Sequence, residues 1–388
     1  MSTAGRPVAL VFRKRILPWS ETFIASQSGA MARYAPVLVG YSRDPGGAAY
    51  VIGRPQLLLN DHSAFPALEK FLLKSAGRAP RRWLRAIAET QPVVLHAHFG
   101  SSALPASRIA RALRIPLVVT YHGMDITVAA TTRAEVERRH RAFAAADRVI
   151  AVSGFIAEVL RKAGCPPEKI TVHFIGVDTA RFTPWAGHGA APDARTAAEA
   201  RSATEVLFVG RLVEKKGVTH LIRAMQEVRR TVPAAELVLA GDGPLRTALE
   251  KECLVHGVPA RFLGVQTPEQ VIGLMRRAAV LCGPSIADSR GNAEGLPITF
   301  LEAQACGLPV IASMSGGTGE GIVHGETGML FTPGDERALA GHLLAMLGPS
   351  NDALRHRVSI AARRYIEQQF DLERQTAALE TIYDEVRA

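Results

Sequence analysis

The sequence lacks the features that mark several classes of protein. Its four cysteines are too far apart to form a C-x-x-C pair, which argues against a zinc site or a redox dithiol. They are Cys165, Cys253, Cys282 and Cys306. We therefore expect reduced thiols, most of them buried.

Long apolar runs are also absent. No run approaches the roughly 20 residues that a membrane-spanning helix needs. Residues 1–12 lack the apolar core and the cleavage site of a signal peptide. These absences predict a cytoplasmic protein.

Aromatic residues are scarce, at 6%, and no run of lysine and arginine interleaves with a series of exposed aromatics. The net charge of +10 favours anionic partners, which include nucleic acid, anionic lipid and phosphorylated ligands. The shortage of aromatics disfavours nucleic acid, so we expect no nucleic-acid partner.

Strand-length apolar runs alternate with helical segments through the first half of the chain. The runs lie at 7–12, 36–41, 92–96, 116–121, 148–152 and 170–175. Runs of this kind are typical of an α/β fold with a parallel sheet covered by helices. Ligands of such sheets lie off the carboxyl ends of the strands, so the residues that follow each strand are the candidates for function.

The alternation stops and then restarts. We predict a first domain over 1–180, a Gly/Ala/Pro-rich linker over 181–204 and a second β/α domain over 205–369. The second domain has strand-like runs at 205–210, 236–240, 260–264, 279–283, 309–312 and 328–331. A last helix at about 370–388 is expected to cross back to the first domain. The cleft between two such domains is the default binding site.

The most informative stretch is 288–311, which reads as a polar loop, a short helix and a buried strand. Pro297 suits the first helical position, and Gly307 suits the left-handed residue just past the helix end. Free N–H groups at such a helix start attract an anion such as phosphate. Glu294, before the helix, and Glu302, inside it, could accept hydrogen bonds from sugar hydroxyls.

A second basic feature follows the strand at 205–210. Gly210-Arg211 places a cation directly after the strand, and Lys216-Gly217 opens the next helix. The planar guanidinium of Arg211 suits phosphate oxygens, and the Lys216 ammonium adds a point charge. Together they could neutralise a diphosphate without a metal. The alternative to a diphosphate site is that Arg211 and Lys216 are two solvated charges on the surface.

Polar residues also follow strands of the first half. Glu21 comes after the first strand, in a polar loop that leads into a helix. Either this loop contacts the substrate, or Ser20 caps the helix and Glu21 lies in its first turn. His96 and His98 lie on one face of a strand end; a metal pair is discounted because no third ligand is evident. His122 and Asp125 flank Gly123 after the next strand and are candidates for sugar contact.

Residues 65–90 combine basic and large apolar side chains, a pattern of surfaces that lie on anionic membranes. The basic residues are Lys70, Lys74, Arg78, Arg81, Arg82 and Arg85. The apolar ones are Phe65, Phe71, Leu72, Leu73, Trp83 and Leu84. The alternative is an ordinary helix pair packed on the sheet.

These motifs, in this order, resemble glycosyltransferase family 4, whose retaining enzymes have two Rossmann-like domains facing across a cleft, the GT-B fold. The resemblance spans nearly the full length and depends on Glu294-x7-Glu302, on Gly210-Arg211 with Lys216, and on His122-Gly123-x-Asp125. Ser20-Glu21-Thr22-Phe23 replaces the family's common Gly-Gly loop. That segment and His96-Ala-His98-Phe99-Gly100 are similar to the bacterial exopolysaccharide subgroup, including colanic-acid-type enzymes.

The resemblance implies roles for individual residues. His122, Arg211, Lys216 and Glu294 would be catalytic, with Glu294 contacting the donor sugar. The residues that would bind the donor are Gly210, Arg211, Lys216, Glu294, Gly295, Leu296, Pro297 and Glu302, the last at the ribose. Those on the acceptor side would be Glu21, His98 and Asp125. We expect no metal and no cofactor, in keeping with the absence of an Asp-x-Asp triplet.

The expected reaction moves a hexose from a nucleotide diphosphate sugar to a hydroxyl of an oligosaccharide, with retention. UDP-hexose is the first expected donor and GDP-mannose the second. A lipid-linked acceptor would suit residues 65–90, which could contact the inner face of the plasma membrane. Two alternatives are a glycoside hydrolase that uses Glu294 and Glu302 as acid and base, and a non-catalytic sugar-nucleotide or nucleic-acid-binding protein.

Overall fold

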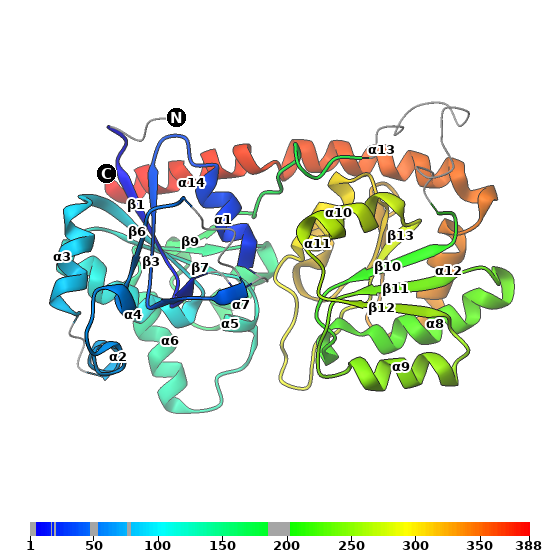
Figure 1. Ribbon diagram of the computed structural model, residues 1–388, viewed down its shortest axis with the longest axis horizontal. Coiled ribbons are helices and arrows are strands. Elements are labelled where there is room, and N and C mark those ends of the chain that lie inside the picture. Colours follow the sequence, from blue (N-terminus) through cyan, green and yellow to red (C-terminus); the bar gives the residue numbers. More distant parts are fainter. Residues whose placement is uncertain (1–4, 17, 19–20, 47–52, 76–78, 185–201) are drawn as a thin grey trace. The chain divides into compact units, whose positions relative to one another are not determined.

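The computed structural model describes residues 5–16, 18, 21–46, 53–75, 79–184 and 202–388 (Figure 1). The chain divides into two compact units, of which the first comprises Met1–Gly176 with Leu372–Ala388 and the second Val177–Asp371. Most of the expected linker, 185–201, lies outside the described residues, and its role as a linker stays a prediction.

The first unit contains a seven-stranded sheet in which every neighbouring pair is parallel. In spatial order its strands are β5 (Gln56–Leu58), β3 (Ala35–Gly40), β1 (Val8–Phe12), β6 (Pro92–His98), β7 (Leu117–Tyr121), β8 (Arg148–Ala151) and β9 (Ile170–Val172). A separate short pair joins β2 (Arg15–Ile16) and β4 (Ser42–Arg43).

Helices flank this sheet (Figure 1). They are α1 (Thr22–Gly29), α2 (Pro66–Ser75), α3 (Arg81–Glu89), α4 (Gly100–Leu113), α5 (Met124–Thr127), α6 (Arg133–Ala145), α7 (Gly154–Lys162) and α14 (Leu372–Arg387), with short 3-10 turns η3 (Leu59–Asp61) and η4 (Pro167–Lys169). The last of the helices, α14, comes from the far end of the chain. It packs on α1 and β6, so the carboxyl-terminal segment completes the first unit.

The second unit contains a six-stranded parallel sheet. In spatial order its strands are β12 (Ala260–Gly264), β11 (Glu236–Ala240), β10 (Glu205–Val209), β13 (Val280–Gly283), β14 (Val310–Ser313) and β15 (Gly328–Phe331). Its helices are α8 (Val218–Thr231), α9 (Arg246–Val255), α10 (Pro268–Arg277), α11 (Ile298–Ala305), α12 (Glu336–Met346) and α13 (Asp352–Gln369), with 3-10 turns η6 (Glu214–Lys216), η7 (Gly316–Gly321) and η8 (Pro349–Asn351).

Both sheets have the doubly wound strand order, which confirms the expected pair of Rossmann-like domains. The order reverses between β1 and β6 in the first unit and between β10 and β13 in the second. At such a point the loops that follow the two strands leave in opposite directions and open a crevice at the carboxyl ends, where ligands bind. The fold therefore singles out the loops after β1, β6, β10 and β13.

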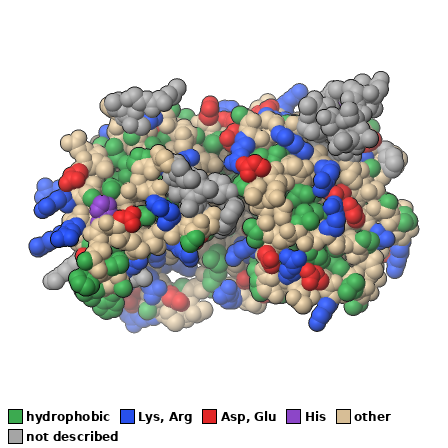
Figure 2. All heavy atoms as spheres, viewed as in Figure 1, with side chains coloured by type: hydrophobic (Ala, Val, Ile, Leu, Met, Phe, Trp, Pro, Cys, Tyr) green, Lys and Arg blue, Asp and Glu red, His purple; other side chains and the backbone are tan. Residues whose placement is uncertain are grey.

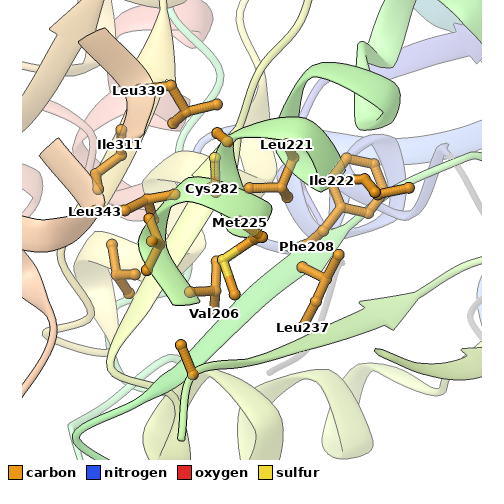
Figure 3. Close-up of a cluster of buried hydrophobic side chains, with 14 of the residues drawn as sticks. Val206, Phe208, Leu221, Ile222, Met225, Leu237, Cys282, Ile311, Leu339 and Leu343 are labelled. Atoms are coloured by element: carbon orange, nitrogen blue, oxygen red, sulfur yellow. The ribbon is translucent and has the colours of Figure 1, made fainter. Parts of the chain in front are cut away.

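The core of the second unit is formed by apolar side chains of the sheet and of the helices that cover it (Figure 3). Phe208 and Val206 on β10 pack with Leu221 and Met225 on α8, and all four are at most 2% exposed. Each such side chain contributes roughly 1.5–3 kcal/mol by leaving water. This packing gives the loops at the strand ends a rigid base.

The short strand β5 at the sheet edge was missed, because three residues give too little alternation to detect. The four cysteines are free and buried, as expected. None of the helices among the described residues is long and apolar enough to cross a membrane.

Candidate active site

Two loops meet at the switch point of the second unit. The turn η6 follows β10, and residues 284–297 follow β13; the N–H of Ile286 donates to the carbonyl of Lys215 at 2.8 Å. Gly217 ends η6 in the left-handed conformation, with φ of 62°, and a Cβ there would lie 1.9 Å from the carbonyl oxygen of Pro284. Only glycine permits this approach, so the sequence Lys-Lys-Gly brings both lysines to the second loop.

Glu294 lies between the two lysines. Its carboxylate is 2.8 Å from Nζ of Lys216 and 3.6 Å from Nζ of Lys215, and Oγ of Ser285 lies 3.5 Å from Oε1. The residue is 7% exposed. Burial raises the pKa of the Glu294 carboxyl, but the charges of Lys216 and Lys215 outweigh burial and the net shift is downward. Glu294 is therefore ionised.

The glycine-rich loop after β14 holds the backbone of Glu294. The N–H of Gly317 donates to the Glu294 carbonyl at 2.9 Å. Gly316 has φ of 66°, and a Cβ there would lie 2.1 Å from the same carbonyl oxygen. The loop therefore fixes the backbone of a predicted ligand-binding residue.

Arg211 presents a cation at the carboxyl end of β10. Its side chain is exposed, and within the described part of the chain its guanidinium has no ion pair. The N–H of the preceding Gly210 is bonded to the carbonyl of Ala240 at 3.0 Å, so the backbone that carries Arg211 is fixed to the neighbouring strand. Lys216 is paired with Glu294 in the free protein, whereas the Arg211 guanidinium is available to bind an anion.

The helix α11 begins at Ile298, one residue later than expected, so Pro297 is the N-cap rather than the first helical residue. Pro297 offers no side-chain hydrogen bond to the first turn, which leaves N–H groups there for a ligand. Gly295, Leu296 and Pro297 are buried, so they shape the approach to the helix start. Helix ends commonly shift by one residue between descriptions.

The other end of α11 behaves as expected. Gly307 has φ of 65°, its N–H donates to the Gln304 carbonyl at 2.9 Å, and Leu308 N–H donates to the Ala303 carbonyl at 2.9 Å. This pair of bonds is the Schellman motif. It ends the helix and turns the chain directly into β14, so a short helix is held at both ends.

Glu302 lies on α11 and is partly exposed. Burial raises the pKa of its carboxyl to about 7, and the positive charge of Arg181 opposes this only in part. In the described residues no ion pair or side-chain hydrogen bond satisfies this carboxylate. Glu302 is thus costly to ionise in the free protein, which suits a group whose partner is a ligand.

Glu302→Gln should stabilise the free protein in a pH-dependent way. The folded pKa of about 7 is above the ordinary 4.5, so the native state keeps a proton that the unfolded chain has lost between these values. Stability therefore falls as pH rises through this window. The variant should gain roughly 3 kcal/mol at pH 8, several degrees in melting temperature, and nothing at pH 4.

Thermal unfolding from pH 4 to pH 8 measures this gain. The matched control is Glu326→Gln, which changes an exposed carboxylate of the same unit. Its melting temperature should differ from that of the wild type by the same amount at every pH. A gain that is equal at both pH values would contradict the titration of Glu302.

Two histidine side chains, those of His98 and His122, lie next to each other at the switch point of the first unit. Nδ1 of His98 lies 3.1 Å from Nε2 of His122; His98 is buried and His122 is half-buried. Burial, followed by a neighbouring histidine and Arg13, lowers the pKa of His122 to about 3 and lowers that of His98 as well. Nδ1 of His122 is buried without a partner in the described residues. The low pKa keeps the ring neutral.

A second set of hydrogen bonds lies beneath this pair. His96 bonds through Nδ1 to the Tyr383 hydroxyl at 2.7 Å and through Nε2 to Thr120 at 2.6 Å, and its ring centroid is 4.3 Å from that of His98. The expected common face of His96 and His98 is thus correct. Both ring nitrogens of His96 are occupied, so this residue supports the site and does not bind ligand.

Asp125 organises the loop after β7. Its carboxylate accepts N–H groups from Gly100 at 2.8 Å, His122 at 3.1 Å and Gly123 at 3.0 Å. It thereby ties the backbone of His122 to the start of α4. The sequence placed Asp125 on the acceptor side; the geometry gives it the task of positioning His122.

Glu21 forms a two-pronged ion pair with Arg13, at 2.7 and 2.6 Å. The Arg13 guanidinium lies 4.2 Å from the Phe99 ring centroid, and that ring lies 4.4 Å from His122. Phe99 has φ of 68°, which is rare for a residue with a side chain. Glu21 is the N-cap of α1 and not part of its first turn, one residue from the expectation, and Ser20, the expected cap, lies outside the described residues.

Several of these residues were missed from the sequence. Lys215 adjoins a predicted lysine, and its position inside the turn was the only available signal. Arg13 and Phe99 follow strand ends, as the predicted residues do. Tyr383 gave no signal, since it reaches His96 from a helix 287 residues away.

Two family models match the chain. The model for Glycosyltransferase Family 4 matches residues 21–181, and the model for Glycosyl transferases group 1 matches residues 194–365. The matches therefore include most of both units, and the second includes the loops after β10 and β13.

Individual proteins are similar over most of the chain. WcaL of Salmonella typhimurium, named as a glycosyltransferase of colanic acid biosynthesis, is 30% identical over 295 residues, covering 74% of this chain and 70% of WcaL. The amylovoran biosynthesis glycosyltransferase AmsK of Erwinia amylovora is 28% identical, covering 71% of this chain and 65% of AmsK. The crystal structure of Anabaena Alr3699/HepE with UDP and glucose has a TM-score of 0.76 at 18% identity, over 97% of this chain and 100% of that one.

Proposed function

The chain belongs to glycosyltransferase family 4 and has the GT-B pair of Rossmann-like domains, and from this premise we propose that it transfers a hexose from a nucleotide diphosphate sugar to a hydroxyl group, with retention. One observation carries the proposal. Arg211, Lys216 and the start of α11 present positive charge and free N–H groups at one switch point, beside the ionised Glu294.

The charge that develops on the leaving diphosphate is the main demand of the reaction. Arg211 supplies a planar guanidinium, Lys216 an ammonium, and α11 the positive end of its dipole. All three lie at one switch point of the second unit, and we propose that the diphosphate draws Lys216 from Glu294 and that the three groups then stabilise the developing charge electrostatically. We propose that they replace a metal ion and that a chelator leaves turnover unchanged.

The two carboxylates divide the recognition of the donor between them. Glu294 accepts hydrogen bonds from the hydroxyls of the transferred sugar, and Glu302 accepts them from the ribose. Ionised Glu294 is prepared for this role by its lysines. Glu302, with its pKa of about 7, takes up its role fully at neutral to alkaline pH.

Retention requires the new bond to form on the face from which the diphosphate leaves. The bond from the sugar carbon to the phosphate oxygen breaks, the acceptor oxygen bonds to that carbon, and the acceptor proton passes to the departing phosphate. No side-chain nucleophile is needed. His122, neutral and with a free nitrogen, supplies a hydrogen bond to the transferred sugar.

Acceptor recognition is assigned to the first unit. Glu21 and His98 offer polar groups there, beside the ring of Phe99, while Asp125 holds the loop of His122. We propose that the acceptor is a lipid-linked oligosaccharide of exopolysaccharide biosynthesis. The names of WcaL and AmsK, as glycosyltransferases of colanic acid and amylovoran biosynthesis, support the exopolysaccharide part of this proposal.

UDP-hexose is the first candidate donor, supported by the UDP and glucose bound to HepE, and GDP-mannose is the second. A panel of UDP- and GDP-sugars, scored by thermal shift, tests the proposal. A donor present at 100 times its dissociation constant stabilises the native state by about 2.7 kcal/mol. Turnover with the best donor, followed by NMR of the product anomer, tests retention. If no nucleotide sugar raises the melting temperature, the proposal fails.

A hydrolase remains the rival to exclude by experiment. The pKa of Glu294 is shifted down and that of Glu302 up, a divergence that glycosidases use. Family membership disfavours hydrolysis. Release of free sugar from an oligosaccharide without any nucleotide would favour it, whereas transfer that requires a nucleotide sugar excludes it.

Contact with an anionic membrane completes the proposal, and helix α2 supports it. Phe65, Leu68 and Phe71 are 71%, 56% and 63% exposed, so three large apolar side chains face water around one helix. Figure 2 shows hydrophobic side chains gathered at the lower left, where α2 lies in Figure 1. Arginines of α3 at positions 81, 82 and 85 are exposed as well.

Not all of the segment 65–90 is available to a membrane. Trp83 and Leu73 are fully buried, and Nε1 of Trp83 donates to the Leu57 carbonyl at 3.0 Å. Trp83 thereby anchors α3 to β5, and Arg78 lies outside the described residues. The proposed contact surface is therefore narrower than the sequence suggested.

The variant Phe65→Ser/Leu68→Ser/Phe71→Ser should lose binding to vesicles that contain anionic lipid, by at least about tenfold in cosedimentation. Each apolar side chain contributes roughly 1.5–3 kcal/mol when it leaves water completely, and membrane insertion realises part of this. Leu254→Ser/Val255→Ser, which changes an exposed apolar pair of the second unit, should bind as the wild type does. Equal binding of all three proteins would exclude α2 as the contact surface.

A further inference from the structure

Two lysines of η6 contact one carboxylate from two sides. Lys216 Nζ lies 2.8 Å from Oε1 of Glu294, and Lys215 Nζ lies 3.6 Å from Oε2. The exposed fractions of the side chains are 17% for Lys216, 11% for Lys215 and 9% for Glu294. All three charges are thus removed from most of the water, where their mutual attraction is strong.

The proposed function makes a demand on this cluster. Lys216 is assigned to the diphosphate, yet in the free protein it is the nearest cation to Glu294. When a diphosphate draws Lys216 away, the buried carboxylate loses its closest partner. A buried carboxylate without a partner takes up a proton, and a protonated Glu294 would no longer be an acceptor-only group for sugar hydroxyls.

Lys215 is built to remain with Glu294. Its backbone carbonyl accepts the N–H of Ile286, and the adjacent Gly217 packs closely against Pro284, so the middle and the carboxyl end of the turn are held against the loop that leads to Glu294. Its mostly buried stem cannot swing freely into solvent. Burial lowers the pKa of Lys215, and Glu294 opposes this shift, which indicates a charge that needs the carboxylate.

We propose that Lys215 is the positioning residue that keeps Glu294 ionised and aimed at the donor sugar while Lys216 serves the diphosphate. This inference rests on the proposed function and adds to it Lys215, which was not predicted from the sequence to be a functional residue. Lys215 itself touches neither sugar nor phosphate in this assignment.

The other charged groups near Glu294 do not replace Lys215. Arg211 acts on Lys215 electrostatically, but it is assigned to the diphosphate together with Lys216. The turn η7, which packs on the Glu294 backbone, carries Glu320, whose negative charge would oppose ionisation of a second carboxylate. Within the described part of the chain, Lys215 is therefore the cation left for Glu294 once the diphosphate is bound.

Proton uptake on binding UDP tests the proposal without turnover. Calorimetric titration at pH 6 in buffers of different ionisation enthalpy gives the number of protons taken up. Relative to the wild type, Lys215→Met should take up additional protons, approaching one per UDP, because Glu294 protonates as Lys216 leaves it. Lys215→Arg should restore the wild-type value. Lys251→Met, an exposed lysine of α9, is the matched control.

The pH dependence of kcat/KM gives a second readout. With the donor that the panel identifies, the acidic limb of the Lys215→Met profile should move up by about one pH unit, and the KM for the donor should rise at least tenfold at pH 6. A residue that is only structural would lower the melting temperature and kcat without moving either the limb or the proton count.

The outcomes separate this inference from the function on which it rests. If the wild type binds UDP and uses a nucleotide sugar, but Lys215→Met matches it in proton uptake and pH profile, the role of Lys215 is overturned and the transferase stands. If the wild type binds neither UDP nor any nucleotide sugar, the proposed function fails first and the role of Lys215 falls with it.

Discussion

Arg211→Ala should lower kcat with the best donor by about a hundredfold to a thousandfold while the melting temperature stays within a degree or two of the wild type. The loss is large because Arg211 is the exposed, unpaired cation at the end of β10, assigned to the charge that develops as the diphosphate leaves. The fold should survive because no described ion pair depends on this side chain. Steady-state kinetics and thermal unfolding measure the two quantities.

Two further variants sharpen this result. Arg211→Lys keeps the charge but loses the planar fork, so it should recover only part of the rate. Arg357→Ala removes an exposed arginine of α13 and should behave as the wild type. Wild-type turnover in Arg211→Ala would remove this residue from the catalytic set, and an equal loss in Arg357→Ala would point to a general effect of net charge.

Glu294→Gln is expected to cost both activity and stability. The amide has nearly the same shape, but it no longer neutralises Lys215 and Lys216, which then remain largely buried without a partner. Breaking a buried ion pair by removing one partner costs about 3–5 kcal/mol. The lost hydrogen bonds to sugar should lower kcat/KM by at least about a hundredfold as well.

Urea unfolding and steady-state kinetics separate the two effects. Glu326→Gln, an exposed carboxylate in the same unit, should change neither. The double variant Glu294→Gln/Lys215→Met removes one of the stranded charges and should regain part of the stability without regaining activity. A Glu294→Gln protein as stable as the wild type would mean that the lysines find other partners, against the geometry of η6.

The sequence predicted well what local pattern determines. All six strands of the second sheet were anticipated, because buried runs such as 236–240 and 279–283 are bounded by polar loops. The strand order brings the carboxyl ends of β10 and β13 together, so the residues that follow these two strands lie close to one another as expected, while their roles stay predictions. The sequence placed Gly307 correctly at the end of α11, because a left-handed backbone conformation strongly favours glycine.

What the sequence could not give depends on distant contacts. Lys216 and Glu294 lie 78 positions apart in the sequence (294 − 216), so no local pattern could predict that they form an ion pair. Trp83 was counted with an exposed apolar set because its neighbours are basic, yet it is buried against the sheet. Tyr383 supports His96 only because α14 returns to the first unit.

The division of the chain has a consequence for engineering. Val177–Asp371 is one uninterrupted insert, whereas the first unit is assembled from two segments that the insert separates. A chimera between relatives should therefore exchange 177–371 as a single cassette and leave 372–388 with its original amino-terminal half. A simple crossover near residue 177 would pair the Tyr383 helix of one parent with the His96 strand of the other, and mismatched parents would lose that hydrogen bond.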